Sequence, residues 1–130
     1  MEKRLILFFL FSFWLPAIAQ TDYFSFEQYT IEDGLSQSEV KCIQQDQKGY
    51  LWLGSLYGLN RYNGLNFEVF LANPGDSNSI SNNIVYTLWL DNKNKLWIGT
   101  QDGLNIYDPG LDKYHVLKKN SQNSNSLADN

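Results

Sequence analysis

The chain has 130 residues, a formal net charge of −4 and 15% aromatic residues. A small acidic chain without a long basic run is not the kind that binds nucleic acid through phosphates, so nucleic acid is excluded as a partner. The aromatic content supplies enough bulky side chains for a packed core, which excludes wholesale disorder.

The first predicted element is an export signal at residues 1–19. Lys3 and Arg4 precede an apolar run from Leu5 to Leu15, and the small-residue site Ala17-Ile18-Ala19 follows. This order is typical of a secretory signal peptide, and the run is shorter than the ~20 residues that a membrane-spanning helix needs. We predict cleavage after Ala19; the alternative is an uncleaved anchor.

Residues 20–34 contain a single strand pattern. The sequence FEQY at residues 26–29 parallels FEVF at residues 67–70, near the end of a later repeat. We predict a lone N-terminal strand here, without the other strands of its sheet.

Residues 35–79 and residues 80–126 are two copies of one repeat. At an offset of 45, the identical positions are Ser36, Val40, Asp46, Lys48, Leu51, Trp52, Gly54, Gly58, Leu59, Asn60 and Tyr62. Two residues inserted after Asp108 change the offset to 47, and the Asn/Ser-rich tail at 120–130 then corresponds to the loop at 73–83. The pattern indicates an internal duplication, with residues 127–130 as the start of a third copy.

Each copy contains four strand patterns. In the first copy they are EVKCIQQ, YLWLGS, LNRYN and NFEVFL at residues 39–45, 50–55, 59–63 and 66–71. In the second they are IVYTLWL, KLWIGT, LNIYD and KYHVLK at residues 84–90, 95–100, 104–108 and 113–118. Four short strands in a repeat of this length are typical of a propeller blade, so the sequence predicts an all-β fold with two four-stranded blades.

The first two strands of each copy are joined by a predicted hairpin turn. Asp46 and Asp91 can cap these turns through their carboxylates, and Gly49 and Asn94 stand where a positive φ is commonly needed. A calcium site is the alternative interpretation, but each loop has too few oxygen ligands for that ion.

Trp52 and Trp97 occupy the same place in the two copies, beside Gly54 and Gly99. A sugar-stacking platform is one interpretation. A wedge that fills the space between adjacent blades is simpler, because a repeated structural position explains a repeated residue. The glycines then mark places where a neighbouring backbone or side chain comes close.

Four pairs of positions break the repeat and are better places to look for specificity. They are Leu56/Gln101, Tyr57/Asp102, Arg61/Ile106 and Gln44/Trp89. The first two pairs lie in the turn before the third strand, and loops often carry binding residues.

The sequences WLGSLYGLNRYNG and WIGTQDGLNIYD, with the strands before them, resemble the two-component regulator propeller repeat. The resemblance covers Tyr23 to the end of the chain. It implies part of a large β-propeller in the periplasmic sensor half of a hybrid histidine kinase, anchored in the inner membrane. It also implies an oligosaccharide or another periplasmic ligand, and a dimer in the full-length sensor.

The lone strand at residues 20–34 also fits this family, because a leading strand in a propeller typically completes the last blade and closes the ring. Two blades cannot close a ring, so we interpret the chain as the N-terminal piece of a longer protein, whose remaining blades are its partners. Self-assembly of several copies into one ring is the alternative, and it would need the lone strand to pair in trans.

The sequence offers no candidate catalytic, cofactor or metal residues, and it leaves the ligand-binding residues unassigned. His115 lies in a strand pattern without a catalytic partner, and Cys42 is interpreted as a small core residue. We therefore predict a non-enzymatic binding module, although the parent is expected to be a histidine kinase. The alternatives are a piece of a propeller-fold lyase or glycan hydrolase, and a propeller scaffold without a small ligand.

Overall fold

The computed structural model describes residues 24–123 and 126–128 of the chain. The predicted export signal at residues 1–19 lies outside the described residues, as do residues 129–130 of the predicted start of a third copy. In the described part, no helix is long and apolar enough to cross a membrane.

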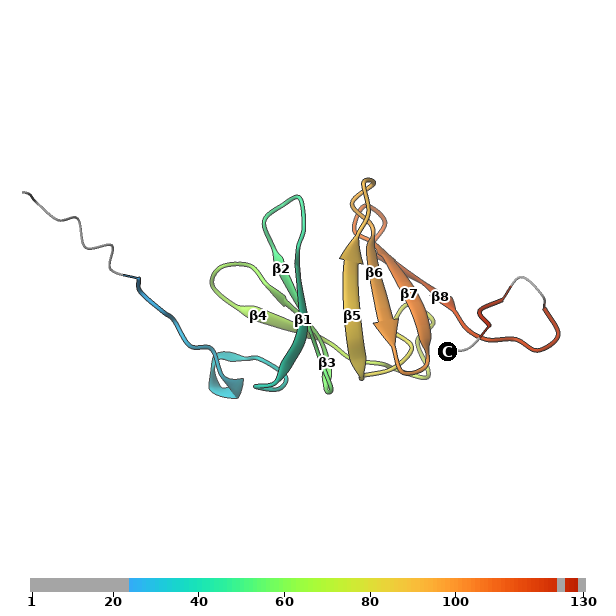
Figure 1. Ribbon diagram of the computed structural model, residues 1–130, viewed down its shortest axis with the longest axis horizontal. Coiled ribbons are helices and arrows are strands. Elements are labelled where there is room, and N and C mark those ends of the chain that lie inside the picture. Colours follow the sequence, from blue (N-terminus) through green and yellow to red (C-terminus); the bar gives the residue numbers. More distant parts are fainter. Residues whose placement is uncertain (1–23, 124–125, 129–130) are drawn as a thin grey trace, which may run out of the picture.

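The described residues form two four-stranded antiparallel sheets (Figure 1). The first has the order β1-β2-β3-β4, with β1 Val40–Gln45, β2 Leu51–Ser55, β3 Gly58–Tyr62 and β4 Phe67–Phe70. The second has the order β5-β6-β7-β8, with β5 Val85–Leu90, β6 Leu96–Thr100, β7 Gly103–Asp108 and β8 Lys113–Leu117. The predicted all-β fold with two four-stranded blades is confirmed.

The first hairpin of each sheet is held by its aspartate. Asp46 Oδ1 accepts hydrogen bonds from the backbone N–H groups two and four residues later, at 2.9 and 3.0 Å, and Asp91 Oδ1 does the same at 2.8 and 2.9 Å. Gly49 has a φ of 88° and Asn94 a φ of 61°. Both are residue types that tolerate the left-handed region, so the turn chemistry predicted from the sequence is confirmed.

The N-terminal segment is unpaired in the described part, so the predicted completion of a last blade by this segment stays a prediction. Residues 24–30 form no strand, and a short 3-10 helix, η1 (Ile31–Asp33), follows them. A strand exists only when its backbone pairs with another, and no described strand pairs with this segment. The Tyr29 ring still packs on the first sheet, with its centroid 5.0 Å from that of Tyr62 and 5.6 Å from that of Phe67.

The loop after each sheet folds in the same way. Ser79 Oγ accepts a hydrogen bond from Asn73 N at 3.0 Å, and Ser126 Oγ accepts one from Asn120 N at 2.9 Å. The two pairs are 47 residues apart, as the sequence alignment of the tail predicts. The tail therefore begins as a second inter-repeat loop.

The hydrophobic core lies between the two sheets, where β5 packs against β1 and β2 (Figure 1). Its buried residues are Trp52, Leu59, Ile80, Val85, Leu88, Leu96, Ile98 and Tyr107. The core thus joins the blades to each other.

Candidate functional site

The repeated polar residues form a buried network at the same place in each sheet. Asn60 Oδ1 accepts a hydrogen bond from Ser36 N at 2.8 Å, and the Ser36 and Ser55 hydroxyls are 3.1 Å apart. In the second sheet, Asn105, Ser81 and Thr100 repeat these contacts at 2.8 and 2.9 Å. Because their polar atoms are used inside each blade, these residues are structural.

The turn aspartates also hold the repeated tryptophans. Trp52 Nε1 donates a hydrogen bond to Asp46 Oδ2 at 2.9 Å, and Trp97 Nε1 donates one to Asp91 Oδ2 at 3.1 Å. Backbone hydrogen bonding from Lys95, with further donors that include the Trp97 indole, lowers the pKa of Asp91. Both carboxylates thus serve their own turns, and nothing favours them as the paired acid and base of a glycan hydrolase.

We name the faces of each sheet by the direction of the chain. The leading face carries Tyr62 in the first sheet and Tyr107 in the second, and the trailing face carries Trp52 and Trp97, respectively. The trailing face of the first sheet packs on the leading face of the second, with 5.4 Å between the ring centroids of Trp52 and Tyr107. Trp52 is 2% exposed and Tyr107 3%, so the interblade role is confirmed for Trp52. Trp97 is half-buried.

The glycines beside the tryptophans allow close packing. A Cβ on Gly54 would lie 2.5 Å from Cys42 Sγ and 2.6 Å from Val85 Cγ1, which belongs to the second sheet. A Cβ on Gly99 would lie 2.6 Å from Thr87 Cγ2. Cys42 packs against the core, as predicted, and burial raises the pKa of its thiol.

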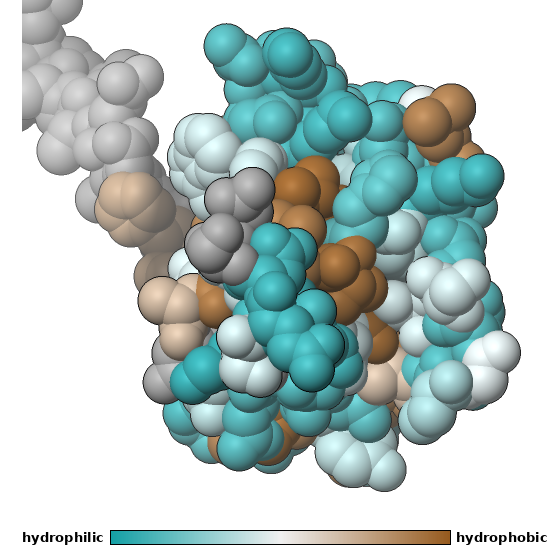
Figure 2. All heavy atoms as spheres, turned by 90° about the vertical axis from the view of Figure 1, so that its right-hand side faces the viewer, coloured by the Kyte–Doolittle hydropathy of each residue, from teal (hydrophilic) through white to brown (hydrophobic). Residues whose placement is uncertain are grey.

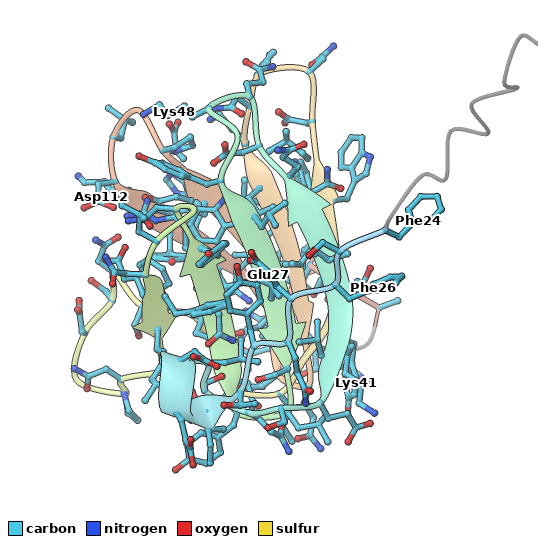
Figure 3. All side chains as sticks on the ribbon, turned by 90° about the vertical axis from the view of Figure 1, so that its left-hand side faces the viewer. Phe24, Phe26, Glu27, Lys41, Lys48 and Asp112 are labelled. Carbon is cyan, nitrogen blue, oxygen red and sulfur yellow. The ribbon has the colours of Figure 1, made fainter. Side chains whose placement is uncertain are left out.

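Two of the repeat-breaking pairs lie together at one end of the sheets. The β2–β3 turn contacts the loop before β5, because Gly58 N donates to Asn83 O at 2.7 Å. The β6–β7 turn contacts the same loop, because Gln101 N donates to Ile84 O at 3.0 Å. This end, which we call the loop end, exposes Tyr57. The β1–β2 turn and the β7–β8 turn lie at the opposite end, where Figure 3 labels Lys48 and Asp112.

A cavity of about 490 Å³ opens at the loop end, between the loop at residues 72–81 and the second sheet. Ser79 in its lining already bonds to the backbone of its own loop, a contact that Ser126 repeats in the next loop. The feature specific to the second copy is the ion pair between Asp102 Oδ2 and Lys118 Nζ at 2.5 Å. The cavity itself is therefore a product of the repeat, and the ion pair is its distinctive chemistry.

Arg61 is the repeat-breaking residue with the most contacts. Its guanidinium lies over the rings of Tyr50, Trp52 and Phe70, at 5.2, 5.4 and 5.6 Å from their centroids, and it pairs with Glu68 Oε2 at 2.5 Å. Arginine stacked on aromatic rings adds attraction to the packing. The sequence showed that Arg61 breaks the repeat but not that it stacks, because the contacting rings come from two different strands, β2 and β4, and from the turn before β2.

The last repeat-breaking pair is Gln44 and Trp89, on β1 and β5. Trp89 is 59% exposed on the trailing face, and its ring centroid is 6.1 Å from that of its cross-strand partner Trp97. His115 is exposed on β8, as predicted. Among the described residues, no group of three or more His, Cys, Asp or Glu side chains could hold a metal ion.

Comparison with known proteins shows which family the repeat resembles. The family model of the two component regulator propeller matches residues 34–57. The repeat is thus similar to the two component regulator propeller over this stretch. The chain is 48% identical over 73 residues to "Histidine kinase P4" of Formosa agariphila. This match covers 55% of this chain and 5% of that protein.

A solved structure with this propeller fold matches the chain with a TM-score of 0.74 and 31% identity. It is the extracellular domain of a putative hybrid two component system from B. thetaiotaomicron, and the match covers 80% of this chain and 15% of that one. The chain therefore spans a small part of each relative. The family resemblance predicted from the sequence is confirmed.

Proposed function

We propose that the chain contributes two blades to the extracellular propeller of a two-component sensor, which is exported to the periplasm and anchored through a longer parent in the inner membrane. The observation that carries this is the likeness to the extracellular domain of the putative hybrid two component system, over 80% of the chain. The export pattern at residues 1–19 supports the same location. The chain itself acts as a binding module, and catalysis belongs to the parent kinase.

The domain division follows the repeat. Residues 35–79 and 80–126 are two blades, residues 127–130 begin a third, and residues 20–34 close the ring by completing the last blade of the parent. The position of Tyr29 supports ring closure, because it lies on Tyr62 of the leading face, where a preceding blade would pack. The remaining blades and a second sensor chain are the proposed partners.

The proposed ligand is an oligosaccharide or another periplasmic molecule bound at the loop end. The repeated polar residues are committed to internal hydrogen bonds, so a ligand has to contact the residues that differ between copies. Tyr57 is 61% exposed and offers a ring face, and Gln101 offers an exposed amide close to the Asp102–Lys118 pair. A ring and amide groups together suit a sugar, which has an apolar face and a hydroxyl rim.

Export is tested by fusing the full chain to alkaline phosphatase, which is active only outside the cytoplasm. We expect activity from the fusion and none after deletion of residues 2–19. Activity that survives the deletion, or is absent from both fusions, would contradict export through this signal.

The ligand is tested separately by probing an oligosaccharide array with the full chain. We expect binding that Tyr57→Ala and Gln101→Ala weaken and that Leu65→Ala, at an exposed turn of the opposite end, leaves unchanged. An array without signal, or a signal unaffected by the first two variants, would refute an oligosaccharide at the loop end and leave the sensor proposal standing.

A further inference from the structure

The cavity at the loop end is built entirely by described residues of this chain. Its lining comes from the loop at residues 72–81, from the β6–β7 turn and from the end of β8. Val116 of the lining stands two residues after Tyr114, which pairs with Tyr107, so the cavity lies on the leading face of the second sheet. That face already forms the filled interface with the first sheet. Figure 2 shows the opposite side of the second sheet, where apolar side chains gather and the next blade of the parent would pack.

Every charged residue of the cavity lining departs from the repeat. These residues are Asp76, Asp102 and Lys118. Their counterparts in the other copy are Asn123, Tyr57 and Leu71, respectively. The blade framework therefore accepts uncharged side chains at all three places. An exposed ion pair adds little to stability, so the needs of the blade do not explain the charges in this cavity.

The lining has more negative than positive charge, because it contains two carboxylates and one ammonium group. Lys118 Nζ pairs with Asp102 Oδ2 at 2.5 Å. A ligand with a carboxylate or sulfate group would face the excess negative charge, and it would compete with Asp102 for Lys118. A hydroxyl group can donate to the carboxylate or accept from the ammonium without breaking the pair. The charge balance thus favours hydroxyl groups over anionic groups.

The size and the apolar part of the cavity suit one end of a small ligand. Its volume of about 490 Å³ lies within the range of small-molecule pockets. Pro74, Ile80 and Val116 contribute apolar surface. The side chains of Asp102 and Lys118 are 42% and 45% exposed, so a ligand can reach them. Apolar surface beside a few polar groups matches a sugar ring, which has an apolar face and a hydroxyl rim.

We propose that this cavity binds a sugar unit without negative charge, and that the Asp102–Lys118 pair determines this specificity. The inference rests on the proposed oligosaccharide ligand and names the chemical class of the unit that is bound. Asp102 accepts a hydrogen bond from one hydroxyl, and Lys118 donates one to a neighbouring hydroxyl, so the pair recognises two adjacent hydroxyls. The ammonium group has three N–H donors, and its contact with Asp102 uses one of them.

The experiment sorts the signals of the oligosaccharide array by the charge of the sugar units. We expect the full chain to bind oligosaccharides without negative charge. Oligosaccharides that contain uronate or sulfated units should bind about tenfold more weakly or worse, because like charges oppose each other in the cavity. Titration calorimetry with the strongest neutral binder and with an oligogalacturonate measures the two affinities.

Two variants test the role of the ion pair. Lys118→Leu should weaken binding of the neutral oligosaccharide about tenfold, because it removes a charged donor, and Leu71 stands at the same place in the first copy. Asp102→Asn releases Lys118 from its partner and should strengthen binding of the oligogalacturonate about tenfold. Glu39→Gln is the matched control, because it breaks an exposed ion pair with Lys41 outside the lining and should change neither affinity. All three variants should keep the thermal midpoint of the parent chain, since exposed pairs contribute little.

Equal or tighter binding of uronate or sulfated oligosaccharides by the parent chain would overturn this inference and leave an oligosaccharide at the loop end standing. Neutral binding that Lys118→Leu and Asp102→Asn both leave unchanged would also overturn it, because the ligand would then bind outside the cavity. An array without signal would refute the oligosaccharide itself, and this inference with it. None of these results bears on export.

Discussion

The two sheets share a repeat but not an environment. Leu88 in the second sheet is 9% exposed, and Ile43, its counterpart in the first, is 59% exposed. Conversely, Trp52 of the first sheet is buried, and Trp97 of the second is half-buried. Each blade therefore carries both kinds of face that form the interblade interface. A face is buried where a neighbouring blade packs against it and stays exposed where none does.

The trailing faces of the two sheets also differ in the charged residues that they carry. The first places the Arg61–Glu68 pair over aromatic rings at the filled interface, and the second has Ile106 and His115 at those positions. Both compositions fit one framework because the pair remains partly exposed at the edge of the face. The framework thus specifies shape, and its edge tolerates changes in charge.

The largest expected effect comes from comparing the two tryptophans. Trp52→Ala removes a ring that bridges both sheets and should lower the free energy of unfolding by about 3–5 kcal/mol, as core aromatic truncations do. Trp97→Ala removes a half-buried ring and should cost about 1 kcal/mol, close to an average substitution. Urea unfolding of both full-chain variants at low protein concentration measures the difference.

Both variants lose the same hydrogen bond from an indole to a turn aspartate, so the matched pair isolates the effect of the neighbouring blade. Equal losses of stability would show that burial between the sheets does not hold them together.

The glycine pair gives a smaller contrast. Gly54→Ala forces a methyl group against Cys42 and Val85, one in each sheet, and overpacking of this kind costs about 1–3 kcal/mol. Gly99→Ala meets only the end of the Thr87 side chain at comparable distance, and that residue is exposed, so we expect a smaller loss. Thermal unfolding of the two variants decides it, and a larger loss for Gly99→Ala would contradict the account.

The fold was largely predictable because the two copies of the repeat have the same residue types at the same structural positions. Strand patterns, turn aspartates and positive-φ residues recur at one offset, and recurrence separates structural residues such as Asp46 and Asp91 from incidental ones. The lone N-terminal strand was predicted from its likeness to residues 67–70, but strand pairing depends on a partner backbone that local sequence does not encode. The segment therefore contacts the sheet through Tyr29 without becoming a strand.

The candidate site was predictable only as a set of positions. Departures from the repeat identified Tyr57, Asp102, Arg61 and Trp89, but nothing in their order along the chain indicated that Asp102 pairs with Lys118. That pair depends on how β8 lies beside β7, a contact set by register. The same limit applies to Arg61, whose stacking depends on side chains brought together by the sheet.

Replacing the charge at the edge of the filled interface should have a still smaller effect. Arg61→Ile gives the first sheet the residue that the second has, and it removes a partly exposed ion pair of a kind worth about 0–1 kcal/mol. The stacking on Trp52 and Tyr50 adds a contribution that an aliphatic chain partly replaces. We expect a change in unfolding free energy within about 1 kcal/mol. A loss as large as that of Trp52→Ala would show that Arg61 is a central part of the interface.

The smallest expected effect is the change in stability at low pH that arises from Asp91, in the turn between β5 and β6. The pKa of Asp91 is lowered from its ordinary value of 3.8, mainly by the backbone N–H of Lys95, because this donor binds the ionised carboxylate. The unfolded chain therefore takes up this proton first as the pH falls. The contribution of Asp91 is fully present above pH 3.8 and is lost as the pH falls below that value through the folded pKa.

Asp91→Asn lacks the titrating group, so the stability difference between the parent chain and this variant should narrow below pH 3.8 and stay constant above pH 5. Unfolding measured across this range tests the sign, and NMR titration of the Asp91 carboxyl carbon tests the cause. A carboxyl that titrates at or above its ordinary value would show that the turn does not depend on the ionised aspartate.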